Sequence, residues 1–497
     1  MKLAILFRSL LAFTLLMVVG ADASVITQAG PRYFAGTSSS FAYAPTHYVD
    51  DYAAVSGATS DNEDRGATAW TNATNPATPT TIGTAVARAI AGNVVRVAPG
   101  TYSVTPIDSR WSPSLSVANS GSSGSPIIFY AQYPGAYNEG STSLYSEIRS
   151  NNSAIRSPVL GVVGGQDYIY FDGFVIDQTY TPPRPSNGTV VLGFSESTGI
   201  QIRRFLFLNV EQPSGDNYPS IYMEGVTSPR VVDSRFRGGN TGGEGDCVTM
   251  YGVYDFTLEY NELIDVRMGM YAKGSAASGT RRNYGRMRYN YASGVTDKVW
   301  FASVVDTTQG VDIYQNLGVG NSQNFRGDPA GDGPSEVHVY NNTFVNAIAN
   351  GGSHDAVFWM EGAVSPSGNE FYNNIVVNLT SSSTVNLGLV QFTSPGAGFA
   401  IYDYNMYWNA GSTLYFGDNQ DDDTSGSWMQ LAAWRTYLTG TAESHSTDDD
   451  PEFVSAGTGN YKLGGASPAR TAGNTGGVIG AYITGNEEMG PRAAPTY

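Results

Sequence analysis

Disulfide bonds within the chain are excluded by its cysteine content. Cys247 is the only cysteine among 497 residues, so packing and backbone hydrogen bonds must hold the fold together. Basic residues are also scarce, with 27 Lys and Arg against 44 Asp and Glu, a formal net charge of −17. Nucleic acid is therefore an unexpected partner, because phosphate binding needs a basic surface.

Long apolar runs are lacking after the first residues of the chain. Residues 1–23 have the features of a signal peptide: Lys2 and Arg8, then an apolar stretch over 10–19, then Ala-Asp-Ala over 21–23. No later segment is long and apolar enough to cross a membrane, and no cysteine follows the leader to carry a lipid anchor. We expect a soluble protein exported to the periplasm or the extracellular space.

A repeat of short β-rich runs is the main feature that the sequence does have. With 59 Gly, 14% charged residues and 12% aromatics, the composition is typical of a long all-β protein with many tight corners. Successive runs end 26 to 32 residues apart, a period typical of a solenoid whose units stack on one another. The alternative is a β-sandwich with Asn-rich turns. The runs end at Gly173, Phe205, Ser234, Asn261, Asn290, Asn316, Asn342, Asn374 and Asn405.

Six successive runs end in asparagine, which suggests a ladder along the stack. Asparagine tolerates left-handed turns and can hydrogen-bond to the same residue one coil away. We expect a single β-helix domain over residues 24–497, with ten or more coils over about 101–415. An N-terminal cap is expected over about 24–100, and a C-terminal cap and tail over about 416–497.

Two short helices are predicted in these caps. The segment from Thr80 to Gly92 has helical spacing and would close the N-terminal end of the stack. A second helix is predicted from Ser427 to Gly440, with Ser427 as the N-cap and Gly440 as the stop signal. Capped ends favour a monomer.

Several segments together carry a resemblance to a known group of proteins. THYVDD, VVRVAPGTY and SPIIFYAQYPG near the N-terminus, the central coils, and DDDPEFV with YKLGGASPAR near the C-terminus resemble secreted right-handed parallel β-helix proteins of the polysaccharide lyase type, such as pectate, alginate and chondroitin lyases. The resemblance covers essentially the whole mature chain and implies a right-handed parallel β-helix with an extracellular, carbohydrate-related role. The same group also contains glycoside hydrolases, uronate epimerases and non-catalytic surface proteins, so fold alone cannot choose the reaction.

A second set of short strands precedes the asparagine-ended runs and offers candidate site residues. Alternation sends every other side chain inward, so the outward residues form two predicted columns along the stack. The first column contains Glu224, Tyr251, Lys273, Ser303, Arg326 and Glu361. The second contains Tyr222, Thr249, Tyr271, Phe301 and Trp359.

These columns suit a polysaccharide lying along the stack. Parallel rungs are about 4.8 Å apart, close to the rise of one sugar unit. The aromatic side chains of Tyr222, Tyr271, Phe301 and Trp359 are the candidates for stacking on sugar rings. The alternative is an outward stack that serves stability alone, with Lys273 paired to Glu224 or Asp246.

Lys273 is the candidate base for β-elimination from a uronate. Its MYAKG context resembles a Lys-Gly motif of lyase-like β-helix proteins. A lysine must lose its proton to act as a base, and nearby cations favour the neutral form. Arg326, Arg281 and Arg282 are the candidates for this effect and for clamping the substrate carboxylate.

The remaining steps have candidates too. Tyr251 is predicted to protonate the departing oxygen, although an outward tyrosine also suits simple stacking. The resemblance implies an arginine one rung beyond the lysine, where this chain has Ser303. Calcium is a candidate neutraliser of the carboxylate, with Glu224, Glu244 and Asp246 as its ligands.

Charge and composition leave several functions open. Between Arg230 and Trp300 there are ten basic residues and eight acids, so we expect an acidic polysaccharide to bind in this region. Alginate and pectate are the leading candidates. The leading prediction is a secreted polysaccharide lyase. The alternatives are a glycoside hydrolase using two of Glu224, Asp246 and Glu361, a C5-epimerase based on the same proton abstraction, and a non-catalytic polysaccharide-binding protein.

Overall fold

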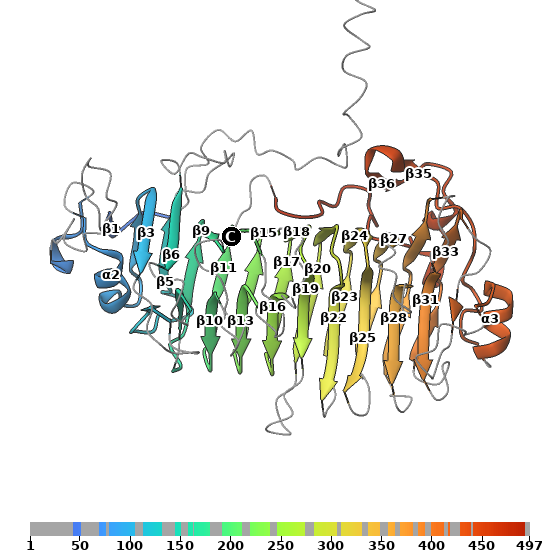
Figure 1. The fold of residues 1–497 in the computed structure, drawn as a ribbon, viewed down its shortest axis with the longest axis horizontal. Helices are drawn as coiled ribbons and strands as arrows, with labels where there is room; N and C mark the ends of the chain where they lie inside the picture. The colour runs from blue at the N-terminus through green and yellow to red at the C-terminus, as the bar shows by residue number, and fades with distance from the viewer. Residues whose placement is uncertain are drawn as a thin grey trace, which may run out of the picture.

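Three long parallel sheets form the body of the molecule in this computed structural model (Figure 1). Each coil contributes one strand to sheet A, then one to sheet B, then one to sheet C, and each strand pairs in parallel with its equivalent in the next coil. The chain is therefore an all-β parallel solenoid, which excludes the β-sandwich alternative. The structure describes residues 43–50, 69–75, 79–104, 113–131, 145–150, 158–162, 164–178, 191–210, 219–238, 246–273, 283–305, 310–330, 336–347, 356–362, 368–380, 386–392, 399–411, 416–417, 428–438 and 441–492.

The strands of the three sheets are short. Sheet A comprises β1 (His47–Val49), β2 (Val94–Val97), β5 (Ile127–Ala131), β8 (Ile169–Asp172), β11 (Gln201–Arg203), β14 (Arg230–Val232), β17 (Phe256–Glu259), β20 (Tyr284–Arg288), β23 (Gly310–Tyr314), β26 (Val337–Tyr340), β29 (Asn369–Tyr372) and β32 (Phe399–Asp403). Sheet B comprises β3 (Gly100–Val104), β6 (Ser146–Ser150), β9 (Val175–Asp177), β12 (Leu206–Leu208), β15 (Arg235–Arg237), β18 (Glu262–Ile264), β21 (Tyr291–Ser293), β24 (Leu317–Asn321), β27 (Thr343–Ala347), β30 (Ile375–Asn378) and β33 (Met406–Asn409). Sheet C comprises β4 (Leu115–Ser116), β7 (Leu160–Val162), β10 (Leu192–Ser195), β13 (Ile221–Glu224), β16 (Asp246–Tyr251), β19 (Met268–Lys273), β22 (Lys298–Val305), β25 (Gln323–Ala330), β28 (Ala356–Gly362), β31 (Asn386–Phe392) and β34 (Phe416–Gly417).

An asparagine ladder runs along the corner between sheets A and B, as the sequence predicts. Asn290 donates from its side-chain amide to Oδ1 of Asn316 at 3.0 Å, and its backbone N–H donates to the same oxygen at 3.0 Å. Asn316 repeats both bonds to Asn342. The left-handed conformation falls one residue earlier than predicted, for example at Tyr289 (φ 56°) and Gln315 (φ 51°). The ladder asparagines turn inward directly after that residue and satisfy the corner's backbone groups.

The interior of the solenoid is one continuous apolar core. Phe129 and Phe171 stack at 5.6 Å, and Phe207 and Phe236 stack at 4.7 Å, so aromatic rings on neighbouring coils lie over each other. Such contacts bury large apolar areas, which is the main source of stability in a chain without disulfides.

Short helices lie at both ends of the stack (Figure 1). Helix α2 (Ile82–Arg88) begins after Thr81, whose hydroxyl oxygen accepts a hydrogen bond from the backbone N–H of Thr84, and it buries Ile82 and Val86 against the core. Helix α3 (Leu431–Leu438) buries Trp434, which stacks on Phe416 at 5.4 Å. The predicted cap and stop residues Ser427 and Gly440 lie outside the described residues.

The C-terminal tail, residues 441–492, returns along the outside of the stack. It contains 3-10 turns, and Ile479 packs with Ile375 on the outer side of sheet B. Arg492 reaches Asp233, many coils earlier, with Nη2 to Oδ2 at 2.7 Å. Its elements are the antiparallel pair β35 (Phe453–Ser455) and β36 (Asn460–Leu463) and the turns η3 (Ala456–Thr458), η4 (Pro468–Arg470) and η5 (Asn474–Gly476); η1 (Trp70–Asn72) lies at the other end of the molecule.

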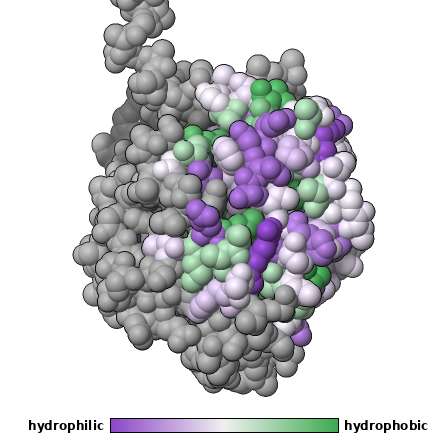
Figure 2. Space-filling model, turned by 90° about the vertical axis from the view of Figure 1, so that its right-hand side faces the viewer, coloured by the Kyte–Doolittle hydropathy of each residue, from purple (hydrophilic) through white to green (hydrophobic). Residues whose placement is uncertain are grey.

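The C-terminal end shows a mixed surface. In Figure 2, hydrophilic residues predominate on its described part, with smaller hydrophobic areas between them. Among the described residues, none of the helices combines the length and the apolar character needed to span a bilayer.

Candidate functional site

The outer face of sheet C carries the predicted site. Alternate residues on its strands point into the core, as the pattern predicts: Ile221, Met223, Val248, Met250, Met270, Ala272, Trp300, Ala302, Phe358 and Met360 are all fully buried. The residues between them align by strand register in two rows. One row, the lysine column, holds Glu224, Tyr251, Lys273 and Ser303; the other, the aromatic column, holds Tyr222, Thr249, Tyr271, Phe301, Arg326 and Trp359.

Lys273 ends β19 on this face and lies between two tyrosine rings. Its Nζ is 5.6 Å from the ring centroid of Tyr251, its register neighbour on β16, and 5.6 Å from that of Tyr271 on its own strand. Within the described part of the chain, Lys273 forms no ion pair with either of the two predicted alternative partners, Glu224 and Asp246.

Tyr222 and Glu224 continue this cluster on β13. The hydroxyl of Tyr222 donates to Oε2 of Glu224 at 3.0 Å, and the rings of Tyr222 and Tyr251 lie 5.5 Å apart. Three tyrosines, one carboxylate and one amine thus lie on three adjacent rungs.

Asp246 is the first residue of β16, the strand that carries Thr249 of the aromatic column. Its side chain is fully buried, and Oδ2 accepts a hydrogen bond from the hydroxyl of Thr249 at 2.6 Å. Burial raises the pKa of Asp246 to about 6, against the lowering effects of that hydrogen bond and of the positive charges of Lys298 and Lys273. Its Oδ1 has no hydrogen-bond partner in the described part of the structure.

Lys298 is a site residue that the sequence analysis missed. Strict alternation fails where sheet C strands begin, because both Val299 and Trp300 point into the core, as Cys247 and Val248 do. This double inward step brings the first residue of β22 close enough to influence the Asp246 carboxyl. Paired inward residues at the strand start are the signal that would have revealed it.

Arg326 lies in a different column from the one predicted. Its register partners are Phe301 and Trp359, so it belongs to the aromatic column, two strands from Lys273. The prediction failed because the interval between the strands changes with loop length, and a two-residue shift in register moves an outward side chain from one column to the other. The guanidinium carbon lies 4.0 Å from the Trp359 ring centroid, a cation–π contact.

The aromatic column is more enclosed than predicted. Tyr222 is 9% exposed, Tyr271 6% and Trp359 3%, and Trp359 also packs beside Trp428. These rings mainly support neighbouring side chains, and direct contact of each with a sugar stays a prediction.

Other predicted site residues lie outside the described residues or side chains. Arg281, Arg282 and Glu244 belong to segments that the structure does not describe, and for Phe301, Ser303 and Glu361 only the backbone is described. Within the described ranges, no group of three or more His, Cys, Asp or Glu side chains is placed to hold a metal ion. With Glu244 outside those ranges, the predicted calcium ligands stay a prediction.

The basic residues between Arg230 and Trp300 do not gather on one face. Lys273 and Lys298 lie on sheet C, Arg235 and Arg237 on sheet B, and Arg230, Arg286 and Arg288 on sheet A. The local excess of positive charge in the sequence therefore marks more than the predicted site.

Comparisons with known proteins bear on the fold. No protein-family model matches the chain, and no curated protein matches it. Solved structures similar to it include pectate lyase Pel9A (15% identity, 82% of this chain and 92% of that chain, TM-score 0.43). They also include the PL6 family polysaccharide lyase Pedsa3628 from Pseudopedobacter saltans (10%, 84% and 98%, 0.43) and the GH136 lacto-N-biosidase from Eubacterium ramulus (10%, 68% and 62%, 0.40).

These identities and TM-scores are too low to carry the activity of any of these proteins over to this chain. The fold itself is a parallel β-solenoid, as its three parallel sheets show.

Proposed function

We propose that this protein is an exported polysaccharide lyase that cleaves a uronate-containing polysaccharide by β-elimination, with Lys273 as the base. The observation that carries the proposal is the position of the Lys273 amine on the outer face of sheet C, between the rings of Tyr251 and Tyr271. Alginate and pectate are the leading substrates. Export rests on the predicted leader of residues 1–23.

The reaction needs a base and a proton donor on neighbouring rungs. Neutral Lys273 would take the proton from C5 of the uronate, the electron pair would form the C4–C5 double bond, and the bond from C4 to the glycosidic oxygen would break. The hydroxyl of Tyr251 would donate its proton to that oxygen. Because Tyr251 and Lys273 are register neighbours, about 4.8 Å apart along the stack, one sugar residue can reach both.

The substrate carboxylate needs a positive charge near it to make the C5 proton acidic. Arg281 and Arg282 follow Lys273 in the chain and are the proposed partners at the reacting sugar. Arg326, two strands away and resting on Trp359, suits a carboxylate further along the polymer. Calcium is a second candidate neutraliser, tested by chelation.

The hydrolase alternative retains one supporting observation. A general acid for glycoside hydrolysis needs a raised pKa, and the pKa of Asp246 is raised to about 6 by burial. Its side chain is fully buried, which keeps it from reaching a glycosidic oxygen in this conformation. The same enzyme preparation should be assayed for new reducing ends, so that hydrolysis and elimination are told apart by the unsaturated product.

The decisive experiment is an ultraviolet assay of the unsaturated uronate. We expect absorbance to rise with alginate or pectate, and not with chondroitin sulfate or hyaluronan, and Lys273→Ala to lower kcat by about a hundredfold to ten-thousandfold. Lys462→Ala is the matched control, because Lys462 also lies over a tyrosine ring, at 5.9 Å from Tyr482, but on the C-terminal tail. Parallel assays with a chelator test the calcium requirement.

Other outcomes would favour a different function for this protein. New reducing ends without an unsaturated product would favour the hydrolase, and proton exchange at C5 without cleavage would favour the epimerase. Retention of full activity by Lys273→Ala would remove the base from the mechanism. Binding of polymer without any product would favour a non-catalytic role.

A further inference from the structure

The outer face of sheet A carries a basic patch far from the lysine of sheet C. On three successive strands, β14, β17 and β20, the outward side chains include three arginines and one acid: Arg230, Arg286, Arg288 and Glu259. The sum of these charges is +2, in a chain whose formal net charge is −17. We call this patch the arginine face.

Strand register places these side chains in two rows along the stack. Arg230, Thr257 and Arg286 align in one row, while Glu259 and Arg288 align in the other. From β14 to β20 there are two steps of about 4.8 Å, so the arginine face spans about 10 Å, or three rungs, along the solenoid axis.

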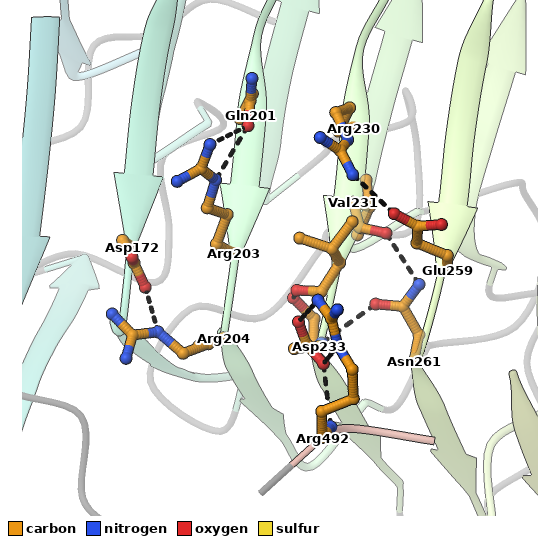
Figure 3. A network of polar contacts seen from close by, with 12 residues as sticks. Asp172, Gln201, Arg203, Arg204, Arg230, Val231, Asp233, Glu259, Asn261 and Arg492 are labelled. Carbon is orange, nitrogen blue, oxygen red and sulfur yellow. Dashed lines mark hydrogen bonds and ion pairs between the residues drawn. The ribbon is translucent and has the colours of Figure 1, made fainter. Parts of the chain in front are cut away.

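Neighbouring side chains hold Arg230 and Arg288 in place, and Figure 3 shows the contact of Arg230 with Glu259. On the adjoining strand β11, Arg203 is buried and lies outside the arginine face: its guanidinium is 4.7 Å from the Tyr170 ring, its Nε is 2.8 Å from the side-chain oxygen of Gln201, and its Nη1 donates to the hydroxyl of Tyr43. Arg230 donates to Glu259 at 2.6 Å, and Arg288 donates to the other oxygen of Glu259 at 2.9 Å. Held guanidinium groups lose less entropy on binding a ligand than mobile ones.

One carboxylate is thus shared by two arginines. Burial raises the pKa of Glu259, but hydrogen bonds and charges from Arg230 and Arg288 outweigh it, so this pKa is lowered and the group is ionised. Here the pairing leaves a positive excess.

Arg286 shows this excess most clearly. It is exposed, and its only hydrogen bond runs from Nε to Oγ1 of Thr257 at 3.3 Å within the described residues. Further along its row the sign reverses, because Asp312 is the next residue in register and Glu370 lies two strands beyond it. The basic patch therefore has a defined end at β20.

We propose that the arginine face is a second binding surface, separate from the Lys273 site, for a strand of an acidic polysaccharide lying along the stack. Guanidinium groups bind carboxylates in a bidentate, planar arrangement, and the three rungs of the arginine face match about three sugar units at one unit per rung. The ligand class rests on the proposed function, whereas the positive charge of the face does not. A noncatalytic surface of this kind would keep the enzyme on its polymer between cleavage events.

The test is affinity electrophoresis of the full chain in gels containing polygalacturonate or alginate, with every variant made in the Lys273→Ala background to prevent cleavage. We expect Arg286→Gln to weaken retardation, and Arg230→Gln with Arg286→Gln to raise the apparent Kd about tenfold. Arg286→Lys should keep most of the retardation. Arg88→Gln, the same charge change at an exposed position of α2, should behave like the parent.

Several results would overturn the proposal. These are unchanged retardation of the double variant, an equal loss in Arg88→Gln, retardation by neutral dextran, or stronger retardation by inorganic polyphosphate than by either polyuronate. The ultraviolet assay is read separately on chains that keep Lys273. Retardation that depends on Arg286, without any unsaturated product, would support this binding surface and refute the proposed lyase activity. An unsaturated product, with retardation that does not depend on Arg286, would support the lyase activity alone.

Discussion

Single asparagines carry much of the organisation of this solenoid. Asn316 is fully buried, and its amide nitrogen donates to carbonyl oxygens of two other residues as well as to Asn342. Its own Oδ1 accepts from both the side chain and the backbone of Asn290. Removing this side chain would leave several buried groups without partners at once.

We therefore predict that Asn316→Ala lowers the free energy of unfolding by about 3 kcal/mol or more. Asn486→Ala on the exposed tail is the control and should change it by less than about 0.5 kcal/mol. Urea unfolding followed by circular dichroism measures both. Equal effects of the two substitutions would show that the ladder adds nothing beyond ordinary surface contacts.

Lys273 shows how much one residue depends on its rung. Its identity as a candidate base came from the local MYAKG sequence, and its outward position follows from alternation. Its neighbours Tyr251 and Ser303 were also placed correctly, because each lies at an equivalent point of the adjoining strand.

At the scale of the elements, the C-terminal end depends on a buried acid. Glu443 is fully buried, accepts a hydrogen bond from the hydroxyl of Tyr407 at 2.5 Å and is also bonded by the Ser446 hydroxyl. The hydroxyl of Ser446 in turn accepts from the backbone N–H of Asn405, the last asparagine of the ladder. Ser446 and Glu443 therefore form the end of the asparagine ladder, next to α3.

Burial raises the pKa of Glu443 to about 7, while hydrogen bonds from Ser446 and Tyr407 act in the opposite direction. A carboxyl with a raised pKa favours the native state when protonated, so this contribution is complete below about pH 4.5 and is lost as pH rises through 7. We predict that Glu443→Gln removes this loss. The Tm of the parent should fall between pH 5 and pH 8 more steeply than that of Glu443→Gln.

Glu488→Gln, an exposed position on the tail, is the control and should keep the pH dependence of the parent. Differential scanning calorimetry across this range gives both curves. Parallel curves for the parent and Glu443→Gln would mean that another group controls stability here.

At the scale of the whole molecule, charge is distributed unevenly over a strongly acidic chain. The arginine face on sheet A and the lysine on sheet C lie on different sides of the same coils, because each coil passes once through every sheet. A polymer could therefore meet the protein on two faces. Repulsion from the remaining acidic surface would restrict binding to these places.

The whole core can be tested through Cys247, which is fully buried on β16. Burial raises the pKa of its thiol well above the ordinary value, so native protein should react very slowly with iodoacetamide. We predict that labelling in native buffer is at least about a hundredfold slower than in urea, and that reductant leaves the Tm unchanged. Rapid labelling of native protein would show that the coils around β16 open without global unfolding.

The sequence by itself determined the solenoid, the inward and outward alternation on sheet C and the asparagine ladder, because each arises from a short local pattern repeated in every coil. Only the tertiary structure decided which side chains share a rung or a face. Arg326 lies in the aromatic column and not in the predicted one, and Lys298 acts on the Asp246 carboxyl. The arginines of β14 and β20 lie on sheet A and not at the predicted site. Corner positions and loop lengths differ from coil to coil, and register follows from them rather than from residue type.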